Sequence, residues 1–257
     1  MNKKDLKDLS IALIDTFYFA GKKSIELRKQ GLKKDIKADN TPVTNGDIEV
    51  NNILTKKIES LTPEIPIVSE ESSLNKNDDA LKKFWLIDPI DGTYDYINNK
   101  DEFTLNAALI IENRPVLGII NAPAKERLFY AYGEDCSYEI INNEHKKLFC
   151  KKLSGKGTIN ALSYSENLKP AIYEMHKKFK VTNFYKVKSS LKFCLIATGE
   201  YDLYVTEPRA REWDIAAGHA IINSARGKIT DFDGKDIFYG KKGFKNPSLI
   251  ARRLGDL

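Results

Sequence analysis

The strongest constraint in this sequence is the segment Trp85-Leu86-Ile87-Asp88-Pro89-Ile90-Asp91-Gly92-Thr93. The apolar run 84–87 predicts a buried strand. We expect this strand to end at Asp88-Pro89, because proline lacks an N–H and does not continue a strand. Gly92 adopts backbone angles closed to other residues, and Thr93 is suited to begin a helix. The segment therefore predicts a strand, a turn that holds two carboxylates, and a helix start.

This turn offers both halves of a metal-dependent phosphoryl site. Carboxylates such as those of Asp88 and Asp91 bind hard cations such as Mg²⁺. The free N–H groups at a helix start bind phosphate. Aspartate is also a common residue of ordinary turns, so this segment alone leaves the structural and the functional interpretation open.

The size and composition of the chain indicate a globular protein. With 257 residues, it is long enough for one large domain or two closely packed lobes. No apolar run approaches the roughly 20 residues of a membrane span. The polar stretch Met1–Ser10 lacks the apolar core of a signal peptide. We therefore expect a cytoplasmic protein, with a loose association with the inner membrane face left open.

Several other classes of protein are disfavoured. The cysteines (Cys136, Cys150 and Cys194) are far apart and form no C-x-x-C pair, which argues against a disulfide framework or a zinc site. The net charge is +5, and the basic residues are spread along the chain. Nucleic-acid binding is not expected, because proteins of that class cluster such residues in a stripe. A mild positive potential does favour a small anionic substrate.

Two amphipathic helices are predicted in the first 60 residues. Apolar residues spaced by three or four predict a helix over 5–30 that ends near Gly31. After a turn-rich loop, Thr44 as the N-cap with Asp47 three residues later resembles a capping box at the start of a second helix. Capping by itself suffices to explain Asp47 at this point.

The segment 65–69 predicts a short strand, followed by Glu70 and Glu71. These glutamates form either a solvated turn or a site at which one of them turns inward beside Asp88 and Asp91. The polar stretch 72–83 predicts a loop.

The rest of the chain alternates between short elements. A strand–turn–strand hairpin is predicted over 103–120, and a further strand over 128–132. We expect a boundary between an N-terminal lobe, 1–155, and a C-terminal lobe, 156–257, which together form one compact catalytic unit. In the second lobe we predict strands over 159–163, 184–187 and 202–206, and helices over 170–179, 189–199 and from Glu212 onward.

Two helix starts in the second lobe carry polar residues. Ser189 and Ser190 are candidate caps whose N–H and O–H groups also suit an anion. The simplest role for Asp214 is that of an N-cap, and the alternative is a third arm of a metal site. The small residues 216–218 and Ala220 predict close packing of the helix they begin.

Four segments together resemble the inositol-monophosphatase superfamily. Asp88-Pro-Ile-Asp-Gly-Thr93 and Trp213-Asp-Ile-Ala-Ala-Gly218 resemble its paired signature, in the same order and about 120 residues apart. Val68–Glu71 and Pro42–Asp47 match its other two metal-site segments. The resemblance covers nearly the whole chain and implies an α+β fold, a layered αβαβα sandwich, often as a homodimer.

Within that superfamily, segments 37–44, 102–109 and 189–194 resemble the bacterial 3′(2′),5′-bisphosphate nucleotidase branch. The resemblance implies a Mg²⁺-dependent, lithium-sensitive phosphatase. Enzymes of this branch remove the 3′-phosphate from adenosine 3′,5′-bisphosphate, which gives AMP and phosphate and belongs to sulfate assimilation.

The physical chemistry agrees with the roles that the resemblance implies. Two nearby metal ions neutralise a phosphate and lower the pKa of a bound water. A ligand set made only of oxygens points to two or three Mg²⁺ ions, with Mn²⁺ as a substitute. The implied residues are Glu70, Asp88, Asp91, Asp214 and the Ile90 carbonyl for the metals, Asp47 and Thr93 for the attacking water, Gly92 and Thr93 for the phosphate, and Ser189, Ser190, Lys192 and Glu212 for the substrate.

Three departures from the branch pattern concern the substrate rather than the metal ligands. Tyr94 stands where the branch usually has lysine, and Lys188 stands where it commonly has glycine. Val205–Arg211 replaces a segment that normally reads close to Pro-Arg-Phe-Gly-Pro-Thr. One alternative is therefore a phosphatase for inositol phosphate or another small sugar phosphate. Another is a non-catalytic nucleotide-binding protein on the same fold.

Overall fold

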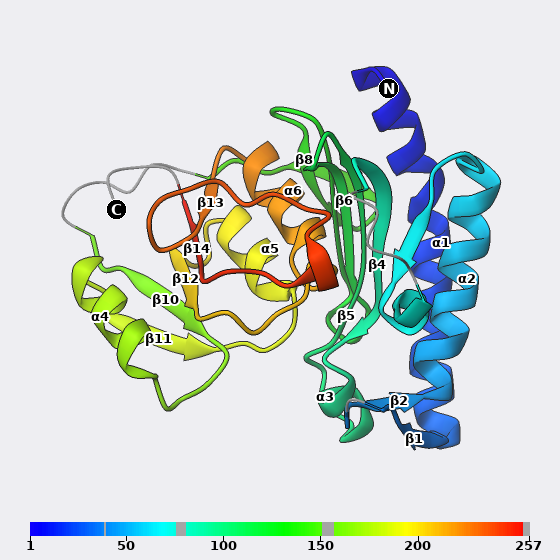
Figure 1. Ribbon diagram of the computed structural model, residues 1–257, viewed down its shortest axis with the longest axis horizontal. Coiled ribbons are helices and arrows are strands. Elements are labelled where there is room, and N and C mark those ends of the chain that lie inside the picture. The colour runs from blue at the N-terminus through cyan, green and yellow to red at the C-terminus, as the bar shows by residue number, and fades with distance from the viewer. Residues whose placement is uncertain (39, 76–80, 151–156, 254–257) are drawn as a thin grey trace.

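The computed structural model describes residues 1–38, 40–75, 81–150 and 157–253. They form five layers (Figure 1): two helices, a seven-stranded sheet, two more helices, a five-stranded sheet and a last helix. The predicted α+β fold, a layered αβαβα sandwich, is therefore confirmed. The predicted lobe boundary at 155/156 lies outside the described residues. The helices are α1 (Lys3–Gln30), α2 (Asn45–Leu61), α3 (Thr93–Ile97), α4 (Pro170–Lys178), α5 (Leu191–Ala197) and α6 (Ala216–Ser224), with short 3₁₀ helices η1 (Glu70–Asn75), η2 (Pro123–Lys125) and η3 (Lys242–Phe244).

The seven-stranded sheet has the strand order β3-β4-β5-β6-β7-β8-β9. Only β3 and β4 pair in parallel; every later neighbour is antiparallel. The predicted hairpin over 103–120 is confirmed as β5 and β6. The strands are β3 (Ile67–Ser69), β4 (Lys83–Asp91), β5 (Thr104–Ile111), β6 (Arg114–Ala122), β7 (Arg127–Tyr132), β8 (Ser137–Ile141) and β9 (Glu144–Lys147).

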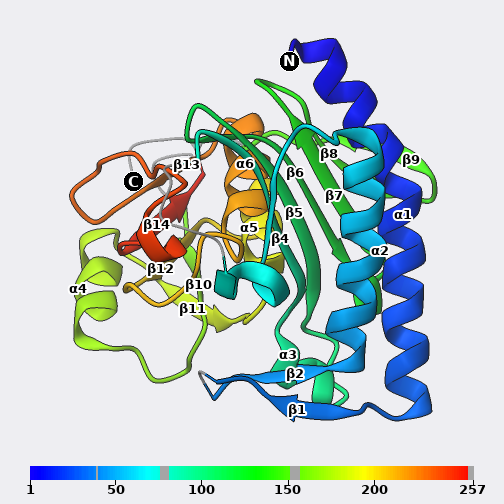
Figure 2. The same ribbon diagram turned by 45° about the vertical axis from the view of Figure 1, so that its right-hand side comes forward.

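Helices α1 and α2 cover the outer face of this sheet, side by side (Figure 2). The predicted stop near Gly31 is confirmed, since Gly31 caps α1 at a φ of 99°. The predicted capping box is also present at the start of α2, where the Thr44 side chain accepts the Asp47 N–H and Asp47 reaches back to the Thr44 N–H. Leu13, Phe17 and other apolar residues of these helices pack on the sheet as one core. The capping box thus sets where α2 begins, and packing onto the sheet holds the helix and Asp47 in place.

Strand β4 extends further than the sequence indicated. The predicted end at Asp88-Pro89 is wrong, because β4 continues to Asp91. Asp88 pairs with Asn106 of β5, and Asp91 pairs with Thr104. The chain therefore advances three residues along β4 but only two along β5. Such a bulge leaves a residue out of the ladder, and proline is tolerated there because no N–H is needed. The bulge therefore lets Pro89 lie within the strand.

The middle layer consists of α5 and α6, whose apolar residues lie between the two sheets. The predicted close packing of the small residues of α6 is confirmed. A side chain on Gly118 of β6 would collide with the Ala217 carbonyl oxygen, and one on Gly218 would collide with the Phe193 ring. Glycine at both positions lets α6 lie directly against β6 on one side and α5 on the other.

The five-stranded sheet has the order β11-β10-β12-β14-β13, and α4 covers its far side (Figure 1). The sequence predicted β10–β12 but not β13 or β14. A two-stranded ribbon, β1 with β2, precedes α2. None of the described helices is both long and apolar enough to cross a membrane. The remaining strands are β1 (Lys34–Ile36), β2 (Pro42–Thr44), β10 (Asn160–Ser163), β11 (Asn183–Lys186), β12 (Leu203–Thr206), β13 (Lys228–Thr230) and β14 (Leu249–Arg252).

Candidate metal centre and active site

Three carboxylates from separate segments meet at the end of β4. Glu70 begins η1 directly after β3, Asp88 lies in β4, and Asp214 lies in the turn before α6. One carboxylate oxygen from each lies within 4.8 Å of the others. Because β3 and β4 are parallel neighbours, their carboxyl ends bring Glu70 and Asp88 together. Of the two interpretations of Glu70, the inward one is therefore correct.

The electrostatics of this cluster favour a cation. Asp88 is 1% exposed, and its Oδ1 has no hydrogen-bond partner. Burial, together with the charges of Glu70 and Asp91, raises the pKa of Asp88 well above its usual range. Burial and the Asp91 charge likewise raise the pKa of Asp214 to about 7. A buried carboxylate oxygen without a donor is costly, and a hard cation bound by oxygens would remove that cost.

Lys37 lies at the edge of the cluster and was given no role from the sequence. Its Nζ is 2.8 Å from Glu70 Oε1 and 2.7 Å from Glu71 Oε1. Burial lowers the pKa of Lys37, but the Glu70 charge and hydrogen bond outweigh it, so the net shift is upward. Glu71, whose pKa burial raises to about 7, points to Lys37. The signal available in the sequence was the position of Lys37 within segment 37–44.

Asp214 does not cap a helix. Helix α6 begins at Ala216 with Ile215 in the N-cap position, so the N-cap role considered for Asp214 is wrong. Its Oδ2 instead accepts the Arg211 N–H at 2.8 Å. This hydrogen bond closes the turn 211–214 and aims the carboxylate toward the cluster. The other interpretation, a third arm reaching the acidic site, agrees with this position.

Asp47 and Thr93 are joined by a hydrogen bond. The Thr93 hydroxyl lies 3.1 Å from Asp47 Oδ1 and 3.0 Å from the Ile90 carbonyl oxygen. Asp47 Oδ2 accepts the Thr44 N–H at 2.8 Å and the Thr44 hydroxyl at 2.6 Å. Burial raises the pKa of Asp47, although these hydrogen bonds oppose the shift. The same contacts that cap α2 therefore also present Oδ1 to Thr93.

Gly92 connects β4 to α3 with a φ of 98°. A side chain at this position would also lie 2.7 Å from the Glu102 carbonyl oxygen. Only glycine combines a low-cost positive φ with this close approach. Gly92 and Thr93 line a cavity of about 430 Å³ together with Glu70, Asp88 and Asp91. The predicted phosphate residues are thus brought to the acidic cluster.

Ser190 links the two parts of the acidic site. Its Oγ lies 2.6 Å from Asp91 Oδ2 and 2.6 Å from the Asp214 carbonyl oxygen, and it accepts a hydrogen bond from Asn106. Ser190 occupies the N-cap position of α5, but its side chain makes no capping hydrogen bond. Ser189 and Ser190 are both fully buried. The predicted capping by Ser190 is therefore wrong, and its Oγ instead contacts two candidate metal ligands, Asp91 and the backbone of Asp214.

The other predicted substrate residues lie in different places. The Lys192 Nζ donates to the carbonyl oxygens of Lys188 and Ser189, and Lys192 lines a second cavity beside Asp91 and Asp214. Glu212 is fully buried, and its carboxylate accepts the N–H groups of Gly240 and Lys241. These contacts anchor the 240–241 loop and do not support the predicted substrate contact of Glu212.

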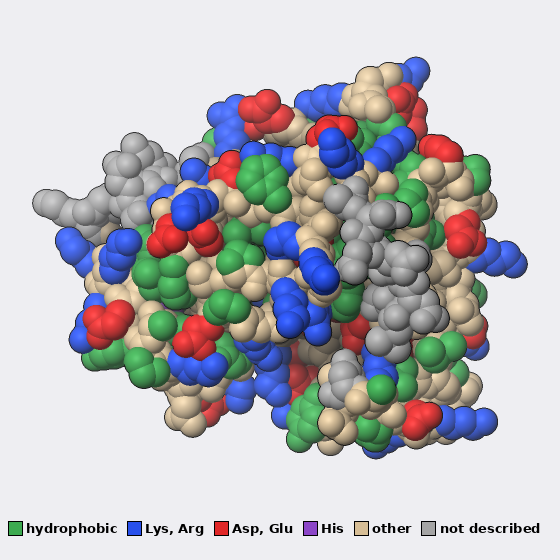
Figure 3. Space-filling model, viewed as in Figure 1, with side chains coloured by type: hydrophobic (Ala, Val, Ile, Leu, Met, Phe, Trp, Pro, Cys, Tyr) green, Lys and Arg blue, Asp and Glu red, His purple; other side chains and the backbone are tan. Residues whose placement is uncertain are grey.

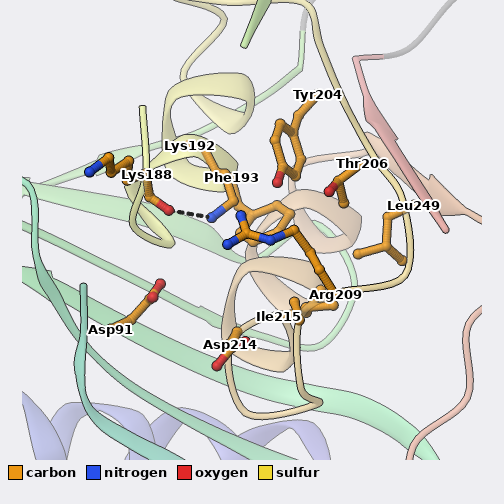
Figure 4. Close-up of a pocket in the computed structure, with 11 residues that line it drawn as sticks. Asp91, Lys188, Lys192, Phe193, Tyr204, Thr206, Arg209, Asp214, Ile215 and Leu249 are labelled. Carbon is orange, nitrogen blue, oxygen red and sulfur yellow. Dashed lines mark hydrogen bonds between the residues drawn. The ribbon is translucent and has the colours of Figure 1, made fainter. Parts of the chain in front are cut away.

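Basic side chains face the acidic ones across these cavities. We name Asp47, Glu70, Asp88, Asp91 and Asp214 the acidic wall, and Lys188, Lys192 and Arg209 the basic wall. All of them line one or both cavities except Asp47, which is hydrogen-bonded to the cavity residue Thr93. Figure 4 shows the carboxylates of Asp91 and Asp214 below the Lys192 and Arg209 side chains. The space-filling view from the side of Figure 1 shows Lys and Arg side chains gathered along the middle of the molecule (Figure 3). The site therefore pairs a place for cations with a place for anions.

Curated relatives match most of the chain. It is 36% identical to the 3′(2′),5′-bisphosphate nucleotidase CysQ of Buchnera aphidicola over 85% of this chain and 83% of that protein. It is 31% identical to the protein of the same name from Haemophilus influenzae over 93% of this chain and 90% of that protein.

Solved structures and a family model agree with these relatives. The crystal structure of CysQ from Bacteroides thetaiotaomicron, a bacterial member of the inositol monophosphatase family, superimposes with a TM-score of 0.77 and 27% identity. That superposition covers 97% of this chain and 98% of the other. The model of the inositol monophosphatase family matches residues 5–255. The chain belongs to the inositol monophosphatase family.

Proposed function

We propose that this chain is a Mg²⁺-dependent phosphatase that removes the 3′-phosphate from adenosine 3′,5′-bisphosphate, which gives AMP and phosphate. The observation that carries the proposal is the convergence of Glu70, Asp88 and Asp214 beside Thr93, next to a cavity. The relatives named 3′(2′),5′-bisphosphate nucleotidase support this choice of substrate. The proposed setting is sulfate assimilation.

The donor set fits Mg²⁺. The candidate ligands are all oxygens, and Asp88 Oδ1 lacks a hydrogen-bond donor, as expected where a hard cation binds. We assign two or three Mg²⁺ ions to this site, replaceable by Mn²⁺. When bound, such ions neutralise the phosphate and lower the pKa of a bound water. The proposed ligands are Glu70, Asp88, Asp91, Asp214 and the Ile90 carbonyl oxygen.

In this proposal Asp47 and Thr93 act on the attacking water. Thr44 fixes Asp47 Oδ2, so Oδ1 stays available to the Thr93 hydroxyl. Burial raises the pKa of Asp47, which makes it a stronger base than an ordinary aspartate. The water proton passes to the Thr93 oxygen as the Thr93 proton moves to Asp47. The chain itself thereby supplies the base.

The phosphate is proposed to lie against the backbone of Gly92 and Thr93. Their N–H groups stand at the start of α3, next to Asp91 at the end of β4. Donors at this point would hold phosphate oxygens while the acidic wall holds the metal ions. Sensitivity to lithium and a homodimeric state remain predictions of the family resemblance.

A substrate panel with purified protein tests the proposal. Phosphate release is measured with adenosine 3′,5′-bisphosphate and with inositol 1-phosphate, in Mg²⁺ and in EDTA. We expect turnover that requires Mg²⁺ and a higher kcat/KM for the nucleotide. If the nucleotide is hydrolysed no faster than the inositol ester, the sugar-phosphate alternative replaces the proposal. Binding of the nucleotide without any turnover would favour the non-catalytic alternative instead.

A further inference from the structure

Two adjoining cavities share one border. The larger one, of about 430 Å³, lies over Asp88 and Thr93. The smaller one, of about 100 Å³, lies beyond Asp91 and Asp214 and reaches inward to Lys192. Asp91, Asp214, Lys188 and Arg209 line both. A ligand with one phosphate at Thr93 can therefore place a second group in the smaller cavity.

The smaller cavity is lined by three cations. The acidic side chains on it, Asp91 and Asp214, are already assigned to the metal centre. Lys192 is 7% exposed, and two of its three N–H groups donate to the carbonyl oxygens of Lys188 and Ser189. With the metals in place the acids are neutralised, and the cavity presents net positive charge. Such a cavity suits a phosphate dianion.

The Lys188 side chain lies beside Tyr94, the residue that follows Asp91-Gly92-Thr93. The Lys188 ammonium lies 5.3 Å from the centre of the Tyr94 ring. It is also 3.2 Å from Asp95 Oδ1, a carboxylate that Lys100 shares at 3.5 Å. Because two lysines share this one carboxylate, a positive charge remains for a ligand. Tyr94 carries no charge where the branch pattern usually has lysine, and Lys188 places a positive charge next to this position.

Arg209 is held in position by an aromatic ring. Its guanidinium carbon lies 4.1 Å from the centre of the Tyr164 ring, and Figure 4 shows the side chain extending toward Lys192. Within the described ranges, no carboxylate forms an ion pair with Arg209. A guanidinium that is stacked on one face keeps its in-plane N–H groups available, in a geometry that matches phosphate.

We propose that Lys188 and Arg209 bind the phosphate that is not cleaved and thereby select doubly phosphorylated nucleotides over phosphate monoesters. This inference rests on the proposed function and adds to it the residues that set its specificity. Lys188 stands where the branch pattern commonly has glycine, and Arg209 lies in the segment Val205–Arg211, in which Pro208-Arg209 keep the Pro-Arg of that pattern. The selecting charges are therefore supplied from the segment before α5 and from the loop after β12.

Two substrates separate this inference from the proposed function. The kcat/KM is measured for adenosine 3′,5′-bisphosphate and for adenosine 3′-monophosphate, in wild type, Lys188→Gln and Arg209→Gln. A charged hydrogen bond contributes enough to change affinity by about tenfold to a hundredfold. We expect the preference for the bisphosphate to fall by about that factor in each variant, chiefly through KM. Lys188→Arg, which keeps the charge, should retain most of the preference.

Matched controls are Lys235→Gln and Arg226→Gln, which remove exposed cations outside both cavities. Their preference should equal that of wild type. An equal loss for both substrates in Lys188→Gln and Arg209→Gln would overturn the inference, because it would indicate a structural role. An unchanged preference in both variants would overturn it as well. The proposed function is judged separately, from bisphosphate turnover by the wild type.

Discussion

The acidic wall and the basic wall meet at the same cavities, but three members of the acidic wall and two of the basic wall lie in different kinds of structure. Asp47, Asp88 and Asp91 lie on a helix and a strand of the main framework, and the first two are almost fully buried. Lys188, which is half-buried, and Arg209, which is exposed, lie in irregular loops. Lys192, the third member of the basic wall, is buried on α5. Framework positions hold a side chain precisely, whereas loops tolerate replacement. The difference suggests that the framework carries the chemistry and that the loops carry the choice of substrate.

The comparison would fail most clearly if the acidic wall were dispensable. Asp91→Asn removes a proposed metal ligand that also receives the Ser190 hydroxyl. Mutation of a group that only hydrogen-bonds to a metal ligand typically lowers metal affinity or activity by about 10- to 100-fold. For the loss of a ligand itself we expect kcat/KM to fall by more than about a hundredfold, while the temperature of thermal unfolding changes little. Phosphate release in Mg²⁺ measures the activity, and circular dichroism during heating measures the unfolding. Near-normal activity would contradict the metal assignment, and Asp233→Asn on an exposed turn is the control.

Thr93→Val tests the proposed base. Valine keeps the shape of threonine but cannot pass a proton to Asp47, which accepts the Thr93 hydroxyl at 3.1 Å. General-base contributions amount to about 10²–10⁴, so we expect kcat to fall by at least about a hundredfold while KM changes little. Thr55→Val, at a half-buried threonine bonded to the backbone of α2, should retain activity. A normal kcat in Thr93→Val would rule out the proton path.

Ser190→Ala tests the positioning of the acidic wall, because Ser190 joins Asp91 to the backbone of Asp214. Its loss loosens two proposed ligands without removing either. We expect the Mg²⁺ concentration for half-maximal rate to rise by about 10- to 100-fold, with partial recovery in Ser190→Thr. Were Ser190 a substrate contact, KM for the nucleotide would rise instead and the Mg²⁺ requirement would stay the same.

A further prediction concerns stability and its dependence on pH. The pKa of Asp214 is raised from 3.8 to about 7 by burial and by Asp91. Between those values the folded state binds more protons than the unfolded chain, so this group lowers stability as pH rises. Without metal, Asp214→Asn should therefore gain Tm relative to wild type from pH 4 to pH 7, by roughly 3–6 °C per pKa unit. Calorimetry in EDTA measures this, and a difference independent of pH would contradict it. Added Mg²⁺ should remove the advantage of the variant.

The acidic wall was largely predictable because local signals coincide with it. Thr44 and Asp47 read as a capping box, and the cap is also what orients Asp47 toward Thr93. The segment from Asp88 to Thr93 carries its own turn chemistry. The bulge that extends β4 to Asp91 was not predictable, because it depends on pairing with β5, a strand more than ten residues away.

The basic wall was only partly predictable, for the same physical reason. Lys192 was a candidate from its segment, whereas Lys188 stood out only as a departure and Arg209 was not singled out within the segment Val205–Arg211. Their proximity results from how α5 and the loop after β12 pack against the end of β4. Glu212 is a residue for which the local signal misleads. It lies next to Trp213 in a segment that resembles the family signature, but its carboxylate accepts the N–H groups of the 240–241 loop. Long-range packing of this kind has no local signature.

The most direct test of the metal centre is anomalous diffraction from crystals soaked in Mn²⁺, a cation that replaces Mg²⁺ at oxygen-ligand sites. We predict at least one strong peak in coordinating distance of Glu70, Asp88 and Asp214, and its loss in Asp88→Asn. Protein from the same preparation should hydrolyse adenosine 3′,5′-bisphosphate with Mn²⁺ in solution. An active preparation whose crystals bind Mn²⁺ elsewhere, with no peak among these carboxylates, would contradict the assignment of the acidic wall as the metal centre.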